Sequence, residues 1–203
     1  MDNTDLRDAL AMIESAGRAA LDAADPEEAI RCLVRGCHER LGDRRAHLRP
    51  GALKPGERQY FVAGAFFVTP DARYHMLVGN VGFPPEQQRL MVPIDGGHPG
   101  WVYAHRSKLL LENTDEHGGF RQYLKSSRMG STIYAPIIWR GEFHGQMVMA
   151  AQARYTMRAQ DLGVLTAVAC IATGLWIAQD GPAWLRAEYP PPDGFWVDRQ
   201  GLD

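Results

Sequence analysis

The sequence predicts an α+β fold, and three observations support that prediction. Two amphipathic helical patterns lie near the N-terminus, over residues 4–22 and 26–41. Segments rich in aromatic and β-branched residues, which favour strands, occupy much of residues 59–151 and include pairs joined by short turns. A long apolar helical pattern follows over residues 157–179. Helices at both ends and paired strands between them are expected to form one α+β domain.

Charge and length limit the possible classes of protein. The chain has 203 residues, of which 22 are basic and 24 acidic, for a formal net charge of −2. No block of like charge is long enough to follow a phosphate backbone, so we expect no nucleic-acid partner. A domain of this length buries most of the surface that its unfolded chain exposes, so it needs no disulfide staples.

The cysteines and the N-terminus indicate a cytoplasmic protein. Cys32, Cys37 and Cys170 form no zinc spacing and no Cys-x-x-Cys redox motif, so we expect reduced thiols. The acidic first residues lack the basic-then-apolar pattern of a secretory signal. The longest apolar stretch, residues 162–177, is shorter than the roughly 20 residues that cross a bilayer. We therefore expect no membrane segment.

Two helices are expected first. The helix over residues 4–22 has an apolar stripe at spacings of three and four, formed by Leu6, Leu10, Ile13, Gly17 and Leu21. The second should begin with Asp25 as N-cap and Pro26 in the first helical position. Its buried stripe is predicted to contain Ile30, Leu33, Val34, Cys37 and Leu41.

Six strands are expected next. Residues 59–69 and 73–81 should form a hairpin, because a turn sequence separates two aromatic and β-branched segments. Residues 132–139 and 142–151 should form another around Arg140 and Gly141, since glycine tolerates the positive φ of tight turns. Shorter strands are expected at residues 90–94 and 109–112.

Alternation along the last two strands predicts which side chains share a face. One face should carry Ser131, Ile133, Ala135 and Ile137, and the other should carry Thr132, Tyr134, Pro136 and Ile138. In the following strand, Phe143 should lie with Gly145, Met147 and Met149, opposite His144, Gln146, Val148 and Ala150, unless a bulge intervenes.

Helices are also expected between the strands and after them. A short helix should run from near His98 to His105, and residues 118–128 should be partly helical. Thr156 is predicted to cap the last helix, which is apolar on nearly every face. Such a helix must be covered twice, and a second copy of the chain is the simplest second cover. The expected homodimer seam consists of Leu6, Leu10, Ile13, Leu165, Ile171, Leu175 and Trp176.

The chain is therefore divided into an N-terminal amphipathic helix (residues 1–25), a central domain (26–179) and a C-terminal tail (180–203). The tail cannot be a regular helix or central strand beyond Tyr189, because its prolines lack backbone donors. Its aromatic residues indicate that it packs onto the domain. They are Trp184, Tyr189, Phe195 and Trp196.

Several motifs within residues 26–178 resemble a GAF domain, a small-molecule sensor module. They are Val92-Pro93-Ile94 with residues 96–102, residues 108–114, residues 129–138 with 141–149, and Asp161-Leu162 with the helix after them. The order of helices and strands is similar as well. The resemblance implies a PAS-related fold with a six-stranded antiparallel sheet and helices on both faces. It also implies a ligand pocket between the sheet and the segments joining its third and fifth strands, and regulatory binding rather than turnover.

The sequence departs from several branches of that family. The Asn-Lys-Phe-Asp-Glu set of the cyclic-nucleotide-binding members is absent, because Asn113, Phe120 and Asp115-Glu116 stand in a different arrangement. Bilin-binding members need a cysteine beside the pocket or near the N-terminus. Free methionine sulfoxide reductases need pocket thiols that can become thiolates. The three cysteines here fall on predicted outer helices, so the ligand or cofactor is unknown.

Ten residues are candidates for the ligand site. Gly96, Gly97, His98 and Gly100 surround a helix N-terminus, where unpaired N–H groups and the helix dipole favour an anion. A tight turn shaped by the same glycines is an equal alternative. The remaining candidates supply polar groups or aromatic walls for an apolar cleft. They are Trp101, Phe120, Tyr123, Ser131, Tyr134 and Gln146.

We therefore expect a sensor that binds a small polar or anionic metabolite and signals to a separate protein. The sequence has no recognised metal spacing, Ser-His-Asp order, nucleophile elbow or Walker-type loop, so it gives no positive sign of catalysis. The alternative is a thiol-dependent reductase similar to free methionine sulfoxide reductase, acting through Cys37 or Cys170. A third hypothesis is an interaction module whose pocket is filled by Trp101 and Tyr123.

Overall fold

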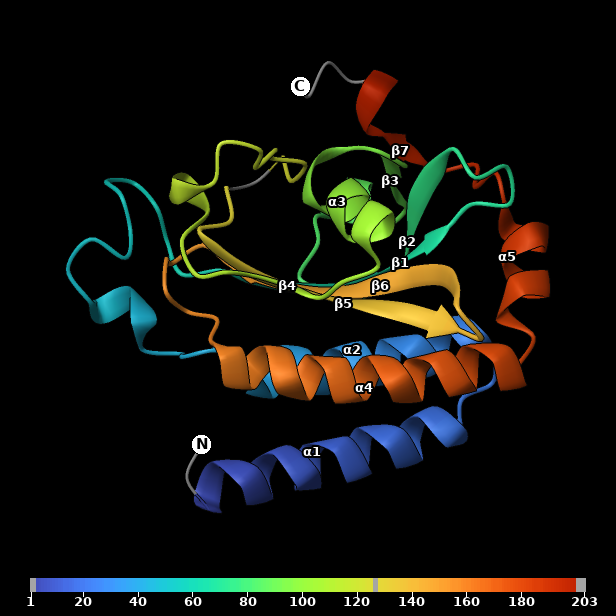
Figure 1. Ribbon diagram of the computed structural model, residues 1–203, viewed down its shortest axis with the longest axis horizontal. Coiled ribbons are helices and arrows are strands. Elements are labelled where there is room, and N and C mark those ends of the chain that lie inside the picture. The colour runs from blue at the N-terminus through green and yellow to red at the C-terminus, as the bar shows by residue number, and fades with distance from the viewer. Residues whose placement is uncertain (1–2, 126–127, 200–203) are drawn as a thin grey trace.

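The computed structural model describes residues 3–125 and 128–199, and a seven-stranded sheet forms its centre (Figure 1). The strand order is β4-β5-β6-β1-β2-β3-β7. The strands are β1 (Phe61–Val68), β2 (Tyr74–Val81), β3 (Leu90–Pro93), β4 (Leu109–Leu111), β5 (Ser131–Trp139), β6 (Glu142–Ala151) and β7 (Phe195–Trp196). The α-helices are α1 (Asn3–Leu21), α2 (Pro26–Arg40), α3 (Gly97–His105), α4 (Ala159–Ala178) and α5 (Gly181–Glu188). Short 3-10 turns are η1 (Ala46–Leu48), η2 (Pro85–Gln87), η3 (Thr114–Glu116) and η4 (Val197–Arg199).

The sheet differs from the six antiparallel strands that the resemblance implied. Strands β1 to β6 do pair antiparallel, but β7 adds a seventh, parallel strand beside β3. In this pairing Leu90 is opposite Phe195, and Met91 is opposite Trp196. Strand β7 lies at the sheet edge and pairs with one neighbouring strand only. Prolines near such a strand are tolerated, because backbone N–H groups on its outer side need no partner strand. The sheet is therefore mixed, although its arrangement with the helices is the expected one.

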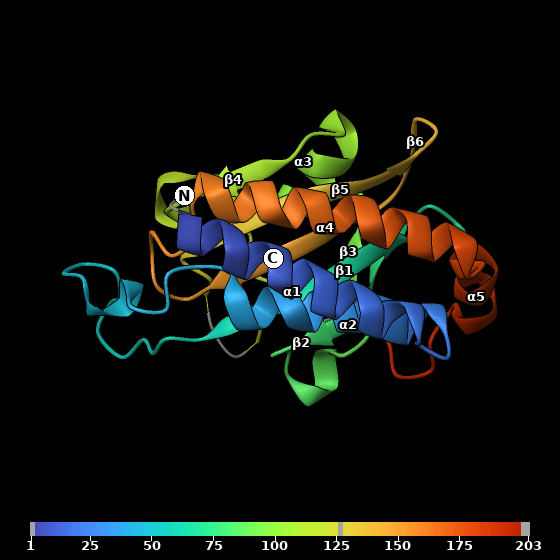
Figure 2. The ribbon, with the colours of Figure 1, turned by 90° about the horizontal axis from the view of Figure 1, so that it is seen from below.

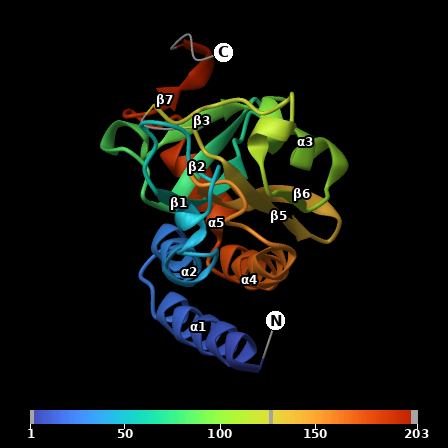
Figure 3. The same cartoon turned by 90° about the vertical axis from the view of Figure 1, so that its left-hand side faces the viewer.

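The two faces of the sheet carry two separate cores. On one face α2 and α4 pack directly on the strands, and α1 lies outside them as a further layer (Figures 1 and 3). This core contains Phe67 stacked on Trp176, with ring centroids 3.7 Å apart. On the other face α3 and the connecting segments cover a second core that includes Phe66, Tyr134 and Val148. The candidate site lies in this second core.

Local sequence signals at two turns are confirmed. Helix α2 begins at Pro26, and the Asp25 carboxylate accepts a hydrogen bond from the Glu28 N–H at 2.8 Å. Strands β5 and β6 meet at Arg140 and Gly141, whose φ angles are 49° and 82°. Two consecutive positive φ values are what the tightest hairpin turns require.

A bulge changes the predicted faces of β6. The pairing with β5 shifts between Ile137 and Ile138, so that Ile138 is opposite Phe143. The prediction that Phe143 lies with Met147 is therefore wrong, because Phe143 joins Val148 in the second core. The extra residue in β6 reverses the alternation on one side of the bulge.

Two helix predictions are also corrected. Residues 118–125 contain no helix, although part of residues 118–128 was expected to be helical. Two glycines, Gly118 and Gly119, disfavour a helix there. Thr156 does not cap α4, since its hydroxyl donates to the Ala153 carbonyl at 2.7 Å. The helix begins two residues later than expected, where the Arg158 N–H donates to the Asp161 carboxylate at 2.8 Å.

Helix α4 has 20 residues and, by length and composition only, could cross a membrane, a test that the core helix of a globular domain also passes. Here one of its faces is buried in the chain's own core, as in the core helix of a globular domain. Leu165 and Trp176 lie on that buried face, so the expected homodimer seam is wrong at these two residues. The outward face carries small residues, namely Gly163, Ala167, Cys170 and Gly174.

The tail packs onto the domain, as its aromatic residues predicted. Trp184 makes an edge contact with Trp176, and Trp196 makes another with Tyr74. The Tyr189 hydroxyl donates to the Asp71 carboxylate at 2.7 Å. Helix α5 ends at Glu188, which agrees with the prediction that the prolines prevent a regular helix beyond Tyr189.

Candidate functional site

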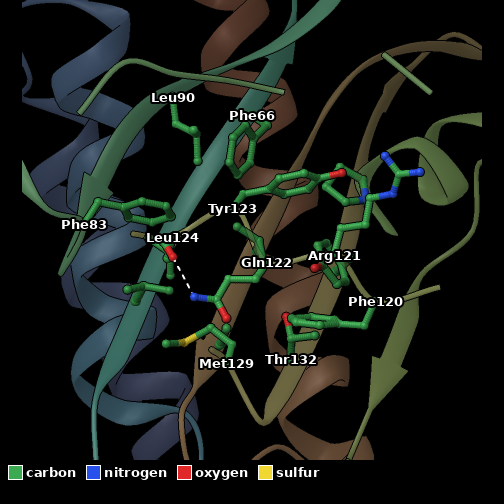
Figure 4. A pocket seen from close by; sticks show the side chains of 15 residues that line it. Phe66, Phe83, Leu90, Phe120, Arg121, Gln122, Tyr123, Leu124, Met129 and Thr132 are labelled. Carbon is green, nitrogen blue, oxygen red and sulfur yellow. Dashed lines mark hydrogen bonds between the residues drawn. The ribbon is translucent and has the colours of Figure 1, made fainter. Parts of the chain in front are cut away.

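A small apolar pocket of about 60 Å³ lies in the second core, between the sheet and residues 120–124, and is open on one side (Figure 4). The rings of Phe66, Phe83, Phe120 and Tyr123 surround it in Figure 4. The full lining consists of Val62, Phe66, Phe83, Leu90, Pro99, Phe120, Arg121, Gln122, Tyr123, Leu124, Met129, Thr132, Tyr134, Val148 and Ala150.

The floor of the pocket comes from alternate residues of neighbouring strands. Val62 and Phe66 project from β1, and Val148 and Ala150 project from β6. Thr132 and Tyr134 project from β5 on the same face, as alternation predicted. Because these positions sit on paired strands, the floor is rigid.

The wall of the pocket, residues 120–124, is held by Gln87. This fully buried side chain donates from Nε2 to the Tyr123 carbonyl at 2.7 Å and accepts at Oε1 from the Lys125 N–H at 2.9 Å. The two bonds replace those that a helix would have supplied to this segment. Sequence reasoning missed Gln87, since a glutamine in a proline-rich connection carries no local signal.

The glycines before and within α3 serve close packing. A Cβ at Gly100 would lie 2.3 Å from the Asp95 carbonyl carbon, so only glycine fits. A Cβ at Gly97 would lie 2.6 Å from the Tyr123 hydroxyl, which covers this end of the helix. The Gly96 N–H already donates to the Pro93 carbonyl at 2.8 Å. The geometry thus favours the tight-turn alternative for these glycines, and the anion site stays a prediction.

His98 lies beside the pocket and is half-buried. Its ring centroid is 5.7 Å from that of Phe120 and 6.5 Å from that of Tyr134, both of which line the pocket. Burial, with a smaller contribution from His117, lowers the pKa of His98, so the ring is mostly neutral at pH 7. Among the described residues, no group hydrogen-bonds its buried Nδ1 atom.

The two tyrosines of the pocket remain protonated. Burial raises the pKa of Tyr123 to about 12, and burial also raises the pKa of Tyr134. The Tyr123 hydroxyl is buried without a hydrogen-bond partner in the described part of the chain. An unpartnered buried hydroxyl is costly, so this end of the pocket can gain from an added polar group.

The other candidates lie outside the pocket lining. Gln146 is fully buried and donates to the Pro99 carbonyl at 3.1 Å, while its own carbonyl oxygen has no partner among the described residues. Ser131 points to the opposite face, where its hydroxyl donates to the Leu111 carbonyl and accepts from the Met157 N–H. Trp101 is exposed and stacks on His105. The binding roles of all ten candidates stay predictions.

The cysteines lie on the helices beneath the sheet, away from the pocket lining. Cys32 and Cys37 belong to α2, and Cys170 belongs to α4. Burial raises the pKa of Cys37 to about 12 and also raises that of Cys32, which disfavours thiolates. Within residues 3–125 and 128–199, no group of three histidine, cysteine, aspartate or glutamate side chains is placed to hold a metal ion.

Comparison with known proteins gives matches to solved structures only. No family model matches the sequence, and no curated protein does. The GAF domain of a phosphoenolpyruvate-protein phosphotransferase from Coxiella burnetii superposes with a TM-score of 0.70 at 16% identity, covering 87% of this chain and 98% of that one. The corresponding Acinetobacter GAF domain gives 0.66 at 13% identity, with 89% and 97% covered. A free methionine-R-sulfoxide reductase from Neisseria meningitidis, in complex with its substrate, gives 0.69 at 15% identity, with 90% and 95% covered.

These superpositions define the class: the chain has the GAF domain fold, as the sequence motifs predicted. The structures that share this fold include both regulatory GAF domains and a reductase, so the fold alone leaves the particular function open.

Proposed function

We propose that this chain is a regulatory protein that binds a small molecule in the pocket beneath residues 120–124 and signals its occupancy to a separate protein. The supporting observation is the pocket itself. It is an apolar cavity on a floor of paired strands; among the residues that the structure describes, the Tyr123 hydroxyl has no hydrogen-bond partner and no cysteine lines the cavity. Apolar pockets with a few polar groups are typical of small-molecule sites.

The proposed signal travels through the wall and the tail. A ligand that contacts the wall changes the position of Lys125, whose ammonium group lies 4.9 Å from the ring centroid of Phe195 in β7. Towards its N-terminal end the tail contacts α4, where Trp184 touches Trp176. Binding would therefore bias the packing of the helices beneath the sheet by favouring one position of the wall.

Native mass spectrometry of the purified chain, followed by hydrogen exchange, tests this proposal. We expect a carried or added small molecule to raise the mass by a constant increment and to slow amide exchange in residues 83–100 and 120–124. Ala150→Phe, which fills the floor of the pocket, should remove both effects. No ligand from a metabolite library, or exchange changes elsewhere in a chain that still binds, would contradict the proposal.

A second candidate is the thiol-dependent reductase, favoured by the likeness to a reductase of the same fold. The cysteine positions support the sensor instead, because the reductase chemistry requires thiolates in the pocket. The discriminating variant replaces Cys32, Cys37 and Cys170 with serine. Reduction of free methionine sulfoxide by the wild type, lost in this variant without loss of fold, would establish the reductase.

We also propose that the protein is cytoplasmic and that two copies pair through α1 and α4. Figure 2 shows α4 uncovered beside α1 on the face away from the sheet. Helix α1 exposes Leu6 and Leu10, and the outward face of α4 exposes the small residues named above. Helices with small residues at the contact can approach closely, and an apolar helix face that water covers is unfavourable.

A further inference from the structure

The pocket also indicates the chemical class of its occupant, an inference that rests on the proposed small-molecule binding. We infer that the pocket accepts a small uncharged molecule with an apolar body and one hydroxyl or carbonyl group, and that it excludes anions of the same shape.

The lining suits an apolar body of a few atoms. Val62, Val148 and Ala150 belong to the floor, Leu124 belongs to the wall, and Met129 completes the apolar lining. Transfer of apolar surface from water onto such a lining is favourable and needs no directional contact. The volume of about 60 Å³ restricts the occupant to a small branched group unless the wall moves.

The polar end of the pocket offers neutral hydroxyl groups. The Thr132 hydroxyl donates to the Met149 carbonyl at 3.1 Å, and Tyr134 follows it on the same face of β5 in the pocket lining. The Tyr123 hydroxyl has no partner among the described residues and can both donate and accept. A hydroxyl, amide or carbonyl group of the ligand can satisfy these atoms.

A buried anion would lack a paired cation at this place. Burial of an ionised carboxylate is costly unless a cation and hydrogen bonds accompany it. His98 is mostly neutral, the Gly96 N–H is already bonded, and Pro99 has no N–H. Among the described residues that line the pocket, Arg121 is the one cation, but it is exposed and shares the neighbouring surface hollow with Asp95 and Asp198.

A titration with three probes of matched shape tests the inference. Isobutanol, isobutyramide and isobutyrate share the same branched apolar end, and only isobutyrate is ionised at pH 7. Each is added to the isotopically labelled full chain, and NMR shifts are followed at the amides of Thr132, Tyr134, Val148 and Ala150. We expect the two neutral probes to bind and isobutyrate to bind at least about tenfold more weakly, since its charge is desolvated without a partner.

Two tyrosine variants show whether the probes use the predicted polar end. Tyr123→Phe removes the hydroxyl that has no partner among the described residues, and we expect it to weaken isobutyramide binding by roughly threefold to tenfold. Tyr155→Phe removes a hydroxyl bonded to Asn113 and Glu116 outside the pocket lining, and it should leave binding unchanged. Equal effects of the two variants would overturn the assignment of this end.

The outcomes separate this inference from the proposed function. Isobutyrate binding as tightly as isobutyramide would overturn the uncharged class and leave small-molecule binding intact. Binding by none of the three probes would overturn the inference, and the mass spectrometry described above then decides the proposed function by itself. Neutral binding that Ala150→Phe abolishes supports both.

Discussion

Arg154 is a single side chain that joins two loops distant in the sequence. It is almost fully buried, and its guanidinium contacts the carboxylates of Glu57 and Asp115. Lys54 and Arg128 also contact Asp115, at 2.7 Å and 3.2 Å. The loop after α2 and the 3-10 turn after β4 are therefore held at one point. A buried cation of this kind stabilises the fold only while both its partners are present.

Removal of this arginine should be costly. We expect Arg154→Ala to lower the free energy of unfolding by about 3–5 kcal/mol, because it leaves two carboxylates near each other without their shared cation. Arg158→Ala is the matched control. The Arg158 side chain is partly exposed and lies 3.9 Å from Glu112, so its loss should cost less than about 1 kcal/mol. Urea denaturation measures both, and equal effects would contradict this account.

Asp115 gives the same cluster a dependence on pH. Hydrogen bonds from Lys54 and Arg154 hold the pKa of Asp115 at about 2, below its usual value of 3.8. Because the folded-state pKa is lowered, the ionised carboxylate stabilises the fold above about pH 4, and this contribution is lost as pH falls towards 2. We expect the stability difference between the wild type and Asp115→Asn to be constant from pH 7 to 5. Urea denaturation at each pH should show it shrinking below pH 4, and a difference unchanged down to pH 2 would count against the ion pairs.

At the scale of elements, the junction between α4 and α5 decides the path of the tail. Asp180 adopts a left-handed conformation with φ of 54°, which ends α4 and turns the chain back towards the sheet. Gly181 follows, and a Cβ there would lie 2.2 Å from the Trp176 ring. Trp176 cannot retreat, since it stacks on Phe67. The tail can turn back to the sheet and form β7 only because Gly181 packs this closely against the Trp176 ring.

Two glycine-to-alanine substitutions distinguish the steric requirement at Gly181 from the general preference of a helix for alanine over glycine. Gly181→Ala should lower the free energy of unfolding by about 1–3 kcal/mol, as overpacking of a core does. Gly174→Ala is the control within α4, where an added Cβ meets nothing within 4 Å. It should raise stability by roughly 0.5–1 kcal/mol, since alanine favours a helix over glycine. Thermal denaturation measures both, and the signs of the two changes must differ.

At the scale of the whole molecule, local patterns were sufficient for most elements. The Asp25 cap, the Arg140-Gly141 turn and the alternation along β5 depend on neighbours in sequence, and each was predicted correctly. The strand β7 was not predicted, because its pairing with Leu90 joins residues 105 positions apart. The bulge in β6 likewise depends on the pairing with β5. The absence of a helix over residues 118–125 has both a local cause, Gly118 and Gly119, and a distant one, the bonds from Gln87.

The candidate site was predicted in part for the same reason. Phe120, Tyr123 and Tyr134 do line the pocket, and His98 lies beside it. Strand alternation placed Tyr134 correctly, whereas Phe120 and Tyr123 reach the pocket from a segment that was expected to be helical and is not. Ser131 lies on the other face, as that same alternation requires of a neighbour of Thr132. Gln87 was missed because its function is to bond the backbone of a segment about 36 residues away.

The proposed pairing of two chains gives the last prediction. The outward face of α4 presents Ala167 near the middle of its row of small residues, and the one charged residue of the helix itself, Asp161, lies in its first turn. We expect a wild-type dimer at micromolar concentration in sedimentation analysis. Ala167→Arg should shift it to monomer, because two such charges would be buried against each other at a symmetric contact. Ala104→Arg, on exposed α3 across the sheet, should leave the dimer intact. A monomeric wild type, or a dimer that survives Ala167→Arg, would remove α4 from the interface, and the signal would then have to leave the molecule by another surface.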